Sequence, residues 1–367
     1  MKLSVHLVSW NGAKYIAPLF DSLRRQTFKD WKLRIWDNDS GDGTVEEIKK
    51  ELANFPFEHE MIENDENIGF AGGHNSLIKN YELRITNYVL LLNQDLYLEA
   101  DCLKKMVKFL DSHDDVAVIS PRLMKWDFNR HSGRSEESLA SGEFTDVIDS
   151  LGLKVFRNRR VVEQYAGNEW NDKLRNQLTK GIASSPPASR NDAYLPVFGV
   201  SGTMPMLRTA AIEQIKFSNG NFLDETYHSY KEDVDLAYRL NSAGFNSATL
   251  LDAVAYHDRS AAGPGALSDA AALANKKKQS DRIKYHSYKN QLMTIYKNEY
   301  WQNFALDFWP ILWYELKKFG YFLIFDRAVL KGLKEIWLNR KGLKLRRIQI
   351  KNKQKIDWKE MRKRLGV

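Results

Sequence analysis

The first 95 residues alternate β-rich runs with segments of helical spacing, and this alternation restricts the fold more than any other feature of the chain. β-rich runs are predicted at residues 3–10, 32–36, 58–62 and 88–92, and helical spacing at 13–26, at 45–52 and in a segment ending near residue 81. The connections between these elements are short. Such alternation is typical of a mostly parallel sheet covered by helices on both faces, so we expect an α/β fold.

The chain beyond residue 121 is less regular. Residues 122–195 are polar with weak periodicity, which indicates an insertion or a mobile region rather than sheet. A helix is predicted over 233–243 and a strand over 247–251, after which the chain continues to His257. The Ala/Gly/Ser-rich residues 261–274 are expected to form a flexible loop.

Composition limits the class of protein and its compartment. A chain of 367 residues with 43% apolar and 12% aromatic residues can fill the core of one large domain plus an appendage. The single cysteine, Cys102, excludes a disulfide framework and a cysteine-built zinc site, and it favours a reducing compartment. The chain has neither a signal-peptide pattern at its start nor an apolar run of 18 residues, so we expect a cytoplasmic protein.

Charge is concentrated at the end of the chain. Residues 331–367 hold 14 Lys or Arg against 3 Asp or Glu, a balance of +11, whereas residues 1–330 sum to −3 within a total of +8. Just before this tail, residues 301–325 interleave aromatic side chains with Lys317 and Lys318. Basic and aromatic helical segments of this kind lie on anionic bilayers, so we predict a peripheral location at the inner face of the cell membrane.

The alternative is that these helices pack onto the first domain or against a second copy of the chain in a homodimer. A nucleic acid is not expected as partner, because no recognition motif accompanies the charge. We therefore predict two units, a domain over residues 1–265 and a helical, basic and aromatic extension over 266–367.

A carboxylate lies at the end of the fourth predicted strand. Asn93, Gln94 and Asp95 directly follow the apolar run 88–92, and ligands bind at the carboxyl ends of strands in open α/β sheets. Asp95 could hold Mg²⁺ or Mn²⁺ together with the diphosphate of a nucleotide, since hard cations prefer oxygen ligands. The alternative is a capping Asp in an ordinary loop.

Three further places carry candidate chemistry. The cluster 37–44 follows the second strand and could contact a nucleobase or ribose, or be an ordinary Asx-rich turn. Residues 67–75 contain three glycines that allow close approach of a phosphate or sugar, although they match neither dinucleotide-binding nor P-loop patterns. Asp233 begins a predicted helix. It could project into a cleft as a base, or its negative charge could simply interact favourably with the helix dipole.

The order of these pieces resembles the inverting glycosyltransferases of family 2 over about residues 3–260. The matching stretches lie at residues 8–11, 37–40, 63–75, 91–95 and 232–236. The stretch Asn67-Ile68-Gly69-Phe70-Ala71-Gly72-Gly73 is similar to the rhamnosyltransferase branch of that family. Five motifs in the family's order are a specific signal.

The resemblance implies a GT-A fold, a Rossmann-like α/β arrangement, and a role for each matching residue. The residues expected to bind the donor are Ser9, Asn11, Asp37, Asn38, Asn67, Gly72, Asn75 and Asn93. Residues 93–95 stand where the family carries an Asp-x-Asp metal motif; because Asn93 replaces the first Asp, Asp95 is the expected metal ligand there. His257 matches a further metal ligand, and Asp233 matches the general base.

The expected function is transfer of a sugar, with inversion, from a nucleoside diphosphate donor to a saccharide or lipid-linked saccharide in cell-surface polysaccharide synthesis. The resemblance favours dTDP-rhamnose as donor, with a UDP-sugar as the alternative. A nucleotidyltransferase that makes the activated sugar would need a Gly-rich loop with a basic residue after the first strand, which residues 9–13 lack. A catalytically inactive, membrane-bound interaction subunit is disfavoured because Asp95, Asp233 and His257 are all present.

Overall fold

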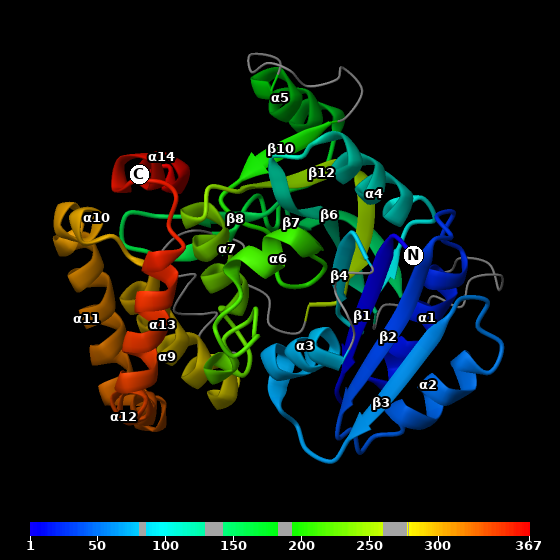
Figure 1. Ribbon diagram of the computed structural model, residues 1–367, viewed down its shortest axis with the longest axis horizontal. Coiled ribbons are helices and arrows are strands. Elements are labelled where there is room, and N and C mark those ends of the chain that lie inside the picture. Colours follow the sequence, from blue (N-terminus) through cyan, green and yellow to red (C-terminus); the bar gives the residue numbers. More distant parts are fainter. Residues whose placement is uncertain (81–85, 129–141, 183–192, 260–276, 278) are drawn as a thin grey trace.

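The computed structural model describes residues 1–80, 86–128, 142–182, 193–259, 277 and 279–367. Its centre is a ten-stranded sheet in which eight strands follow one another in the order β10-β12-β6-β11-β4-β1-β2-β3 (Figure 1). The first half contains β1 (Leu3–Ser9), β2 (Trp31–Asn38), β3 (His59–Asn64) and β4 (Tyr88–Leu92), all mutually parallel. The prediction of a mostly parallel α/β sheet is therefore confirmed.

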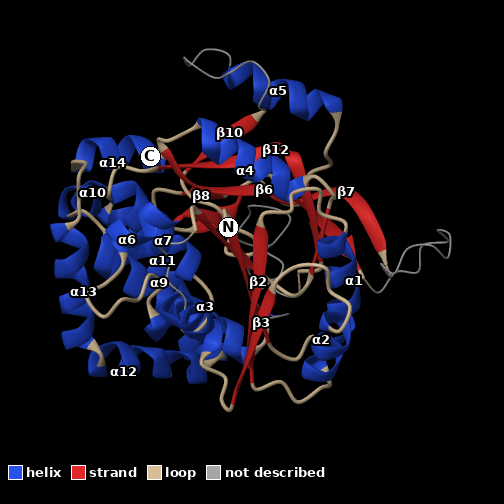
Figure 2. Ribbon diagram, turned by 45° about the vertical axis from the view of Figure 1, so that its right-hand side comes forward, coloured by secondary structure: helices blue, strands red, loops and turns tan. Residues whose placement is uncertain are grey.

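Helices cover both faces of this sheet. On one face lie α1 (Ala13–Arg24), α2 (Thr44–Leu52) and α4 (Cys102–Ser112), and on the other α3 (Gly69–Asn80), α6 (Thr209–Ile215) and α7 (Glu232–Ser242). Strand β4 contributes side chains to both faces. Leu90 and Leu92 belong to the core under α1, α2 and α4, and Val89 and Leu91 belong to the core under α3, α6 and α7. Figure 2 shows α1 and α2 on one side of β2 and β3, with α3 on the other side.

The second half of the sheet includes residues that were expected outside it. Here lie β5 (Leu96–Leu98), β6 (Val116–Asp127), β7 (Glu143–Ser150), β10 (Tyr194–Val197), β11 (Met206–Arg208) and β12 (Asn246–His257). The prediction that residues 122–195 are not sheet is wrong for the described residues, which also contain β8 (Leu153–Val155), β9 (Val161–Glu163) and α5 (Asp172–Ile182). Strands β7 and β10 are only partly buried, so their sequences lack a clear apolar pattern. Residues 261–274 lie outside the described residues, and their prediction is untested.

Six α-helices follow the sheet in the described part of the chain. They are α9 (Asp281–Asn298), α10 (Trp301–Leu306), α11 (Phe308–Phe325), α12 (Lys331–Leu338), α13 (Arg340–Asn352) and α14 (Trp358–Leu365). Met361 and Leu365 of α14 share a buried core with Val234, Ala237 and Tyr238 of α7. A helical extension is therefore present, and it packs directly on a helix of the sheet domain. None of the helices in the described ranges is long and apolar enough to cross a membrane.

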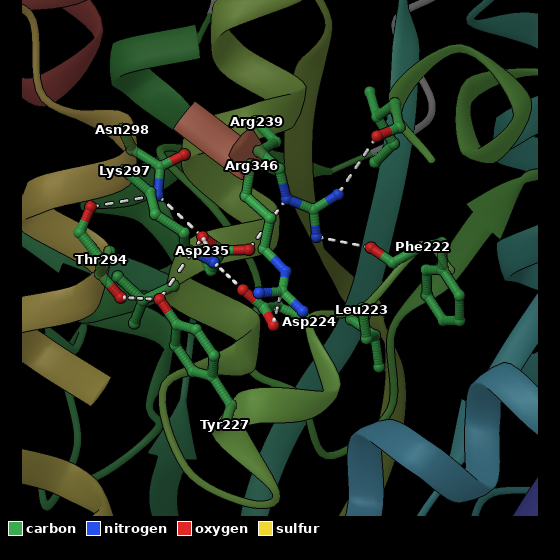
Figure 3. A network of polar contacts seen from close by, with 12 residues as sticks. Phe222, Leu223, Asp224, Tyr227, Asp235, Arg239, Thr294, Lys297, Asn298 and Arg346 are labelled. Carbon is green, nitrogen blue, oxygen red and sulfur yellow. Dashed lines mark hydrogen bonds and ion pairs between the residues drawn. The ribbon is translucent and has the colours of Figure 1, made fainter. Parts of the chain in front are cut away.

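A buried network of charges joins the extension to α7 (Figure 3). The Lys297 ammonium of α9 lies 2.5 Å from Asp224 Oδ2 and 2.9 Å from Asp235 Oδ1, and all three side chains are almost fully buried. Arg239 Nε lies 2.9 Å from Asp235 Oδ2, and Arg346 Nε of α13 lies 3.1 Å from Asp224 Oδ1. Burial alone would raise the pKa of Asp235, but Lys297 and Arg239 outweigh it and lower that pKa, so the carboxylate stays ionised.

We predict that Lys297→Met lowers the free energy of unfolding by about 3–5 kcal/mol, because it leaves two buried carboxylates with less compensating charge. Chemical denaturation followed by circular dichroism measures this change. The matched control is Lys341→Met, at an exposed position of α13, which should change the free energy of unfolding by about 0.5 kcal/mol or less. A loss below about 1 kcal/mol for Lys297→Met would show that the network contributes little to stability.

Candidate active site

The carboxyl ends of five strands meet at one edge of the sheet. β1, β2 and β4 are parallel to one another, and β6 is parallel to β12. The short strand β11 pairs antiparallel with both β4 and β6, so the two parallel groups run in the same direction. The residues that follow β1, β2, β4 and β12 are therefore brought to the same edge, although they are far apart in sequence.

Ser9, Asn11 and Asp37 lock the loops after β1 and β2 together. Ser9 Oγ donates a hydrogen bond of 2.7 Å to Asp37 Oδ2, and Ser40 donates to both carboxylate oxygens of Asp37. Asn11 has a φ of 47°, and its side-chain oxygen accepts from the backbone N–H of Gly41 at 2.9 Å. The structure thus brings three predicted donor-binding residues together, and hydrogen bonds within the protein fix their positions.

Gln94 connects the β4 end to this loop, a contact that sequence reasoning missed. Its side-chain oxygen accepts from Trp10 N–H and its side-chain nitrogen donates to Trp10 C=O, both at 2.9 Å. A Cβ atom at Gly12 would lie only 2.2 Å from the Gln94 amide, so a side chain there would displace this amide. The loop after β1 and the segment before Asp95 therefore form one unit. Asn93 lies beside it, partly buried, with its N–H donating to Thr203 C=O at 3.2 Å.

Asn38, Asn67, Gly72 and Asn75 organise the start of α3. Asn38 donates to Gly69 C=O at 3.2 Å, and Asn67 Oδ1 accepts from Gly69 N–H at 2.9 Å. Gly72 is buried, and a Cβ atom there would lie 2.9 Å from the side chain of Ile68.

The amide of Asn75 is buried and holds the segment that leads to α7. Its oxygen accepts from Phe222 N–H and Leu223 N–H, and its nitrogen donates to Leu223 C=O at 2.9 Å. Hydrogen bonds within the protein thus fix the Asn75 amide, and its expected place in the donor pocket stays a prediction.

Asp95 and His257 converge across the pairing of β5 with β12. His257 is the register partner of Leu96, and its Nε2 lies 3.3 Å from Asp95 Oδ2. Its Nδ1 lies 2.9 Å from Asp149 Oδ2, a buried carboxylate on β7. Burial alone would lower the pKa of His257, but Asp95 and Asp149 outweigh it and raise the pKa to about 9.

The donor set of this pair fits a divalent cation. A carboxylate and an imidazole suit Mn²⁺ better than Mg²⁺, and a histidine that ligates a metal commonly donates its other N–H to a carboxylate, as His257 can to Asp149. In the described part of the chain no group of three or more His, Cys, Asp or Glu side chains could hold an ion together. Asp95 and His257 would therefore hold it as two protein ligands, with water and diphosphate oxygens completing the shell.

Asp233 lies in the first turn of α7 and faces a small apolar pocket. Its Oδ1 accepts from Val234 N–H at 2.7 Å and its Oδ2 from Gly202 N–H at 3.2 Å. Phe70, Leu91 and Leu236 are among the residues that line the same pocket. Neighbouring Glu232 is buried, and burial together with the Asp233 charge raises the pKa of Glu232 to about 8.

A strained turn places the start of α7 near the strand edge. His228, Tyr230 and Lys231 have φ values of 61°, 70° and 72°, which are uncommon for residues other than glycine. Gly202 N–H donates to Asp233 of α7, and the nearby Thr203 C=O accepts from Asn93 N–H, so α7 begins close to the end of β4.

A parallel sheet whose carboxyl edge gathers carboxylates, amides and an imidazole is typical of nucleotide-binding α/β proteins. Residues 4–183 match the family model described as "Glycosyl transferase family 2". The chain therefore carries a glycosyltransferase family 2 domain.

Two curated relatives agree with this family. "Putative glycosyltransferase EpsE" of Bacillus subtilis (strain 168) is 25% identical over 126 residues, 34% of this chain and 44% of that protein. "Bifunctional glycosyltransferase pgtA" of Dictyostelium discoideum is 22% identical over 123 residues, 34% of this chain and 16% of that protein. The chain spans less than half the length of these relatives.

Three solved structures are similar to this chain, and the one with a TM-score above 0.5 supports the fold. GalNAc-T7, crystallised with UDP, GalNAc and Mn²⁺, superposes with a TM-score of 0.54 at 9% identity over 81% of this chain and 48% of that chain. S. aureus TarS 1-349 in complex with UDP-GlcNAc superposes with a TM-score of 0.48 at 17% identity, over 88% of this chain and 73% of that chain. The mannosyltransferase PcManGT from Pyrobaculum calidifontis, in complex with GDP-Man and Mn²⁺, superposes with a TM-score of 0.47 at 14% identity. The match covers 96% of this chain and 86% of that chain. The fold is of the GT-A type, as predicted.

We predict that nucleoside diphosphates bind at least about tenfold more weakly when EDTA removes divalent cations, because the diphosphate then faces the Asp95 carboxylate unscreened. Calorimetric titration of UDP and dTDP, with Mn²⁺ and with EDTA, measures the difference. In Asp95→Asn the affinity should respond much less to Mn²⁺. Equal affinity of the wild type under both conditions would overturn the metal assignment of Asp95 and His257.

Proposed function

We propose that this protein transfers a sugar from a nucleoside diphosphate donor to an acceptor hydroxyl. The observation that carries the proposal is the convergence of Asp95 and His257, 3.3 Å apart, beside the interlocked loops after β1 and β2. The family 2 match over residues 4–183 supports the same chemistry. Asp233 on α7 is then the general base.

The proposed reaction is a single displacement at the anomeric carbon. The acceptor oxygen forms a bond to that carbon, while the bond to the β-phosphate oxygen breaks and its electron pair leaves with the nucleoside diphosphate. Asp233 takes the acceptor proton, and its two backbone hydrogen bonds keep its carboxylate in place for this transfer. A divalent cation held by Asp95 and His257 would neutralise charge on the departing diphosphate. Backside attack in one step inverts the configuration.

The proposed donor rests on the resemblance of the glycine-containing stretch to the rhamnosyltransferase branch. The sequence at Asn67–Gly73 favours dTDP-rhamnose, with a UDP-sugar as the alternative. GalNAc-T7, whose fold is similar, was crystallised with UDP, GalNAc and Mn²⁺, which supports a nucleoside diphosphate sugar as the class of donor. We propose a saccharide or lipid-linked saccharide of the cell surface as the acceptor.

Release of nucleoside diphosphate from a panel of nucleotide-sugars tests the proposal. The purified protein is incubated with Mn²⁺, each donor and candidate acceptors, and the products are separated by mass spectrometry. Transfer from one donor supports the proposal, and anomeric configuration in the product tests inversion. Formation of a nucleotide-sugar from a nucleoside triphosphate and a sugar phosphate would instead support a nucleotidyltransferase. Binding of donor without turnover on any acceptor would favour an inactive interaction subunit.

We predict that Asp233→Asn lowers kcat by about 10²- to 10⁴-fold and leaves donor affinity near that of the wild type. The amide keeps the shape of the carboxylate but cannot accept the acceptor proton. Steady-state kinetics and donor titration measure the two effects separately. Asp235→Asn on the same helix is a structural comparison, expected to act through stability. A loss of less than about tenfold for Asp233→Asn would exclude Asp233 as the base.

The proposed membrane location rests on an exposed apolar face of helix α11. This helix lies at the outer edge of the molecule (Figure 1). The α11 stripe comprises Trp309, Trp313, Leu316, Leu323 and Ile324, which recur at helical spacing. Trp309 is 75% exposed, Trp313 65% and Ile324 70%. An apolar stripe of this length on one helix face marks an interaction site.

An anionic bilayer is the occupant that fits the surroundings of the α11 stripe. The following helices α12 and α13 expose Lys331, Lys334, Lys341 and Lys344. Tryptophans beside lysines suit the headgroup region, where each basic residue contributes about 1 kcal/mol near an anionic surface. Lys318, expected to contribute to this charge, is instead buried and lies 3.0 Å from Glu315.

We predict that the protein binds phosphatidylserine-containing liposomes and that Trp309→Ser with Trp313→Ser abolishes this binding. Cosedimentation measures it, and high salt should weaken it by screening the lysines. Lys341→Glu with Lys344→Glu should weaken binding, whereas Lys104→Glu with Lys108→Glu on α4 should not. If the wild type ignores liposomes but forms a dimer that the tryptophan substitutions dissociate, the α11 stripe is a subunit interface.

A further inference from the structure

A cation from the C-terminal extension lies on the loop after β1. Arg282, in the first turn of α9, places its guanidinium carbon 4.6 Å from the ring centre of Trp10. Arg282 is exposed, and Trp10 is 42% exposed. A guanidinium that stacks on an aromatic face directs its N–H groups outward along its own plane. The Trp10 ring therefore holds a charged, multiple hydrogen-bond donor at the rim of the candidate site.

Trp10 connects this cation to the metal-type carboxylate. The backbone of Trp10 exchanges two hydrogen bonds of 2.9 Å with the side chain of Gln94, the residue before Asp95. The residue before Trp10 is Ser9, whose hydroxyl is bonded to Asp37. Arg282 is thus anchored on a loop that is tied on one side to the predicted nucleoside residues and on the other to Asp95.

Tyr230 lies beside α9, since Asn290 of that helix donates a hydrogen bond of 2.7 Å to the Tyr230 carbonyl. Burial raises the pKa of Tyr230, the Arg282 cation lowers it, and the carboxylates of Glu232 and Asp95 raise it. Arg282 likewise adds to burial in lowering the pKa of His228, two residues earlier. The start of α9, which carries Arg282, therefore lies against the turn that precedes α7.

We propose that Arg282 binds the diphosphate of the donor and stabilises it as the leaving group. The proposal rests on the proposed glycosyl transfer and adds a binding residue that lies outside the motifs found in the sequence. A guanidinium recognises phosphate oxygens through paired, charge-assisted hydrogen bonds. Negative charge grows on the bridging phosphate oxygen as the anomeric bond breaks, so the interaction strengthens toward the transition state.

Calorimetric titration of UDP, dTDP and GDP, and of the corresponding nucleosides, tests the role of Arg282 in the presence of Mn²⁺. Arg282→Ala is expected to weaken binding of the preferred diphosphate by about 10- to 100-fold and to leave nucleoside binding unchanged. Arg282→Lys keeps the charge without the planar fork and should recover part of the affinity. Arg340→Ala is the matched control, because Arg340 forms a similar stack, 4.2 Å from the Trp337 ring centre.

The outcomes separate this proposal from the function on which it rests. Diphosphate affinity of Arg282→Ala equal to the wild type overturns the role of Arg282 and leaves glycosyl transfer intact. Equal weakening of nucleoside and diphosphate also overturns it, since Arg282 would then act only by packing on Trp10. Thermal unfolding of each variant shows whether the fold is retained, and Arg282→Lys supplies the answer if Arg282→Ala is unstable. A wild type that binds no nucleoside diphosphate would overturn the proposed function itself.

Discussion

The candidate site depends on one constraint, the antiparallel pairing of β5 with β12. After β4 the chain passes Asp95, and β5 then pairs with the end of β12, so that Leu96 lies opposite His257. A shift of one residue in this register would turn the His257 side chain to the other face of the sheet. The 3.3 Å separation of Asp95 and His257 is therefore a property of strand pairing. Asp149 then fixes the imidazole from β7, a strand that pairs with β6.

Helix α7 receives a second constraint from buried charges. Asp233 at its start faces the site, and Asp235, two residues later, is buried against Lys297 and Arg239. Buried ion pairs contribute uncertain net stability, because desolvation opposes the Coulomb attraction, but a single arrangement satisfies all members of the network. The rotation of α7 about its axis is thereby fixed, and with it the direction of Asp233. The C-terminal extension thus supplies part of the support of the candidate base.

The sequence predicted the elements whose periodicity is strong and missed the contacts that depend on tertiary structure. Ser9 and Asp37 lie at the ends of strands, and Asp95 follows one. The apolar runs of these strands were recognisable, and parallel order brings such positions to one edge. Asp149 was missed because it lies on a partly exposed strand without an apolar pattern. Arg282 carries no local signal, since its position has meaning only after α9 folds back onto Trp10.

Helix α11 shows why helical periodicity could not decide between membrane and protein packing. Both sides of the helix carry apolar residues, and its inner side also buries Lys318 with Glu315 beside Ile311 and Phe322. Burial lowers the pKa of Lys318 while Glu315 opposes the shift, so the inner side carries the electrostatic cost of a desolvated ion pair. The same side buries Ile311 and Phe322, so packing within the protein leaves the α11 stripe as the uncovered apolar face. A bilayer or a second copy, as proposed, would remove this apolar area from water.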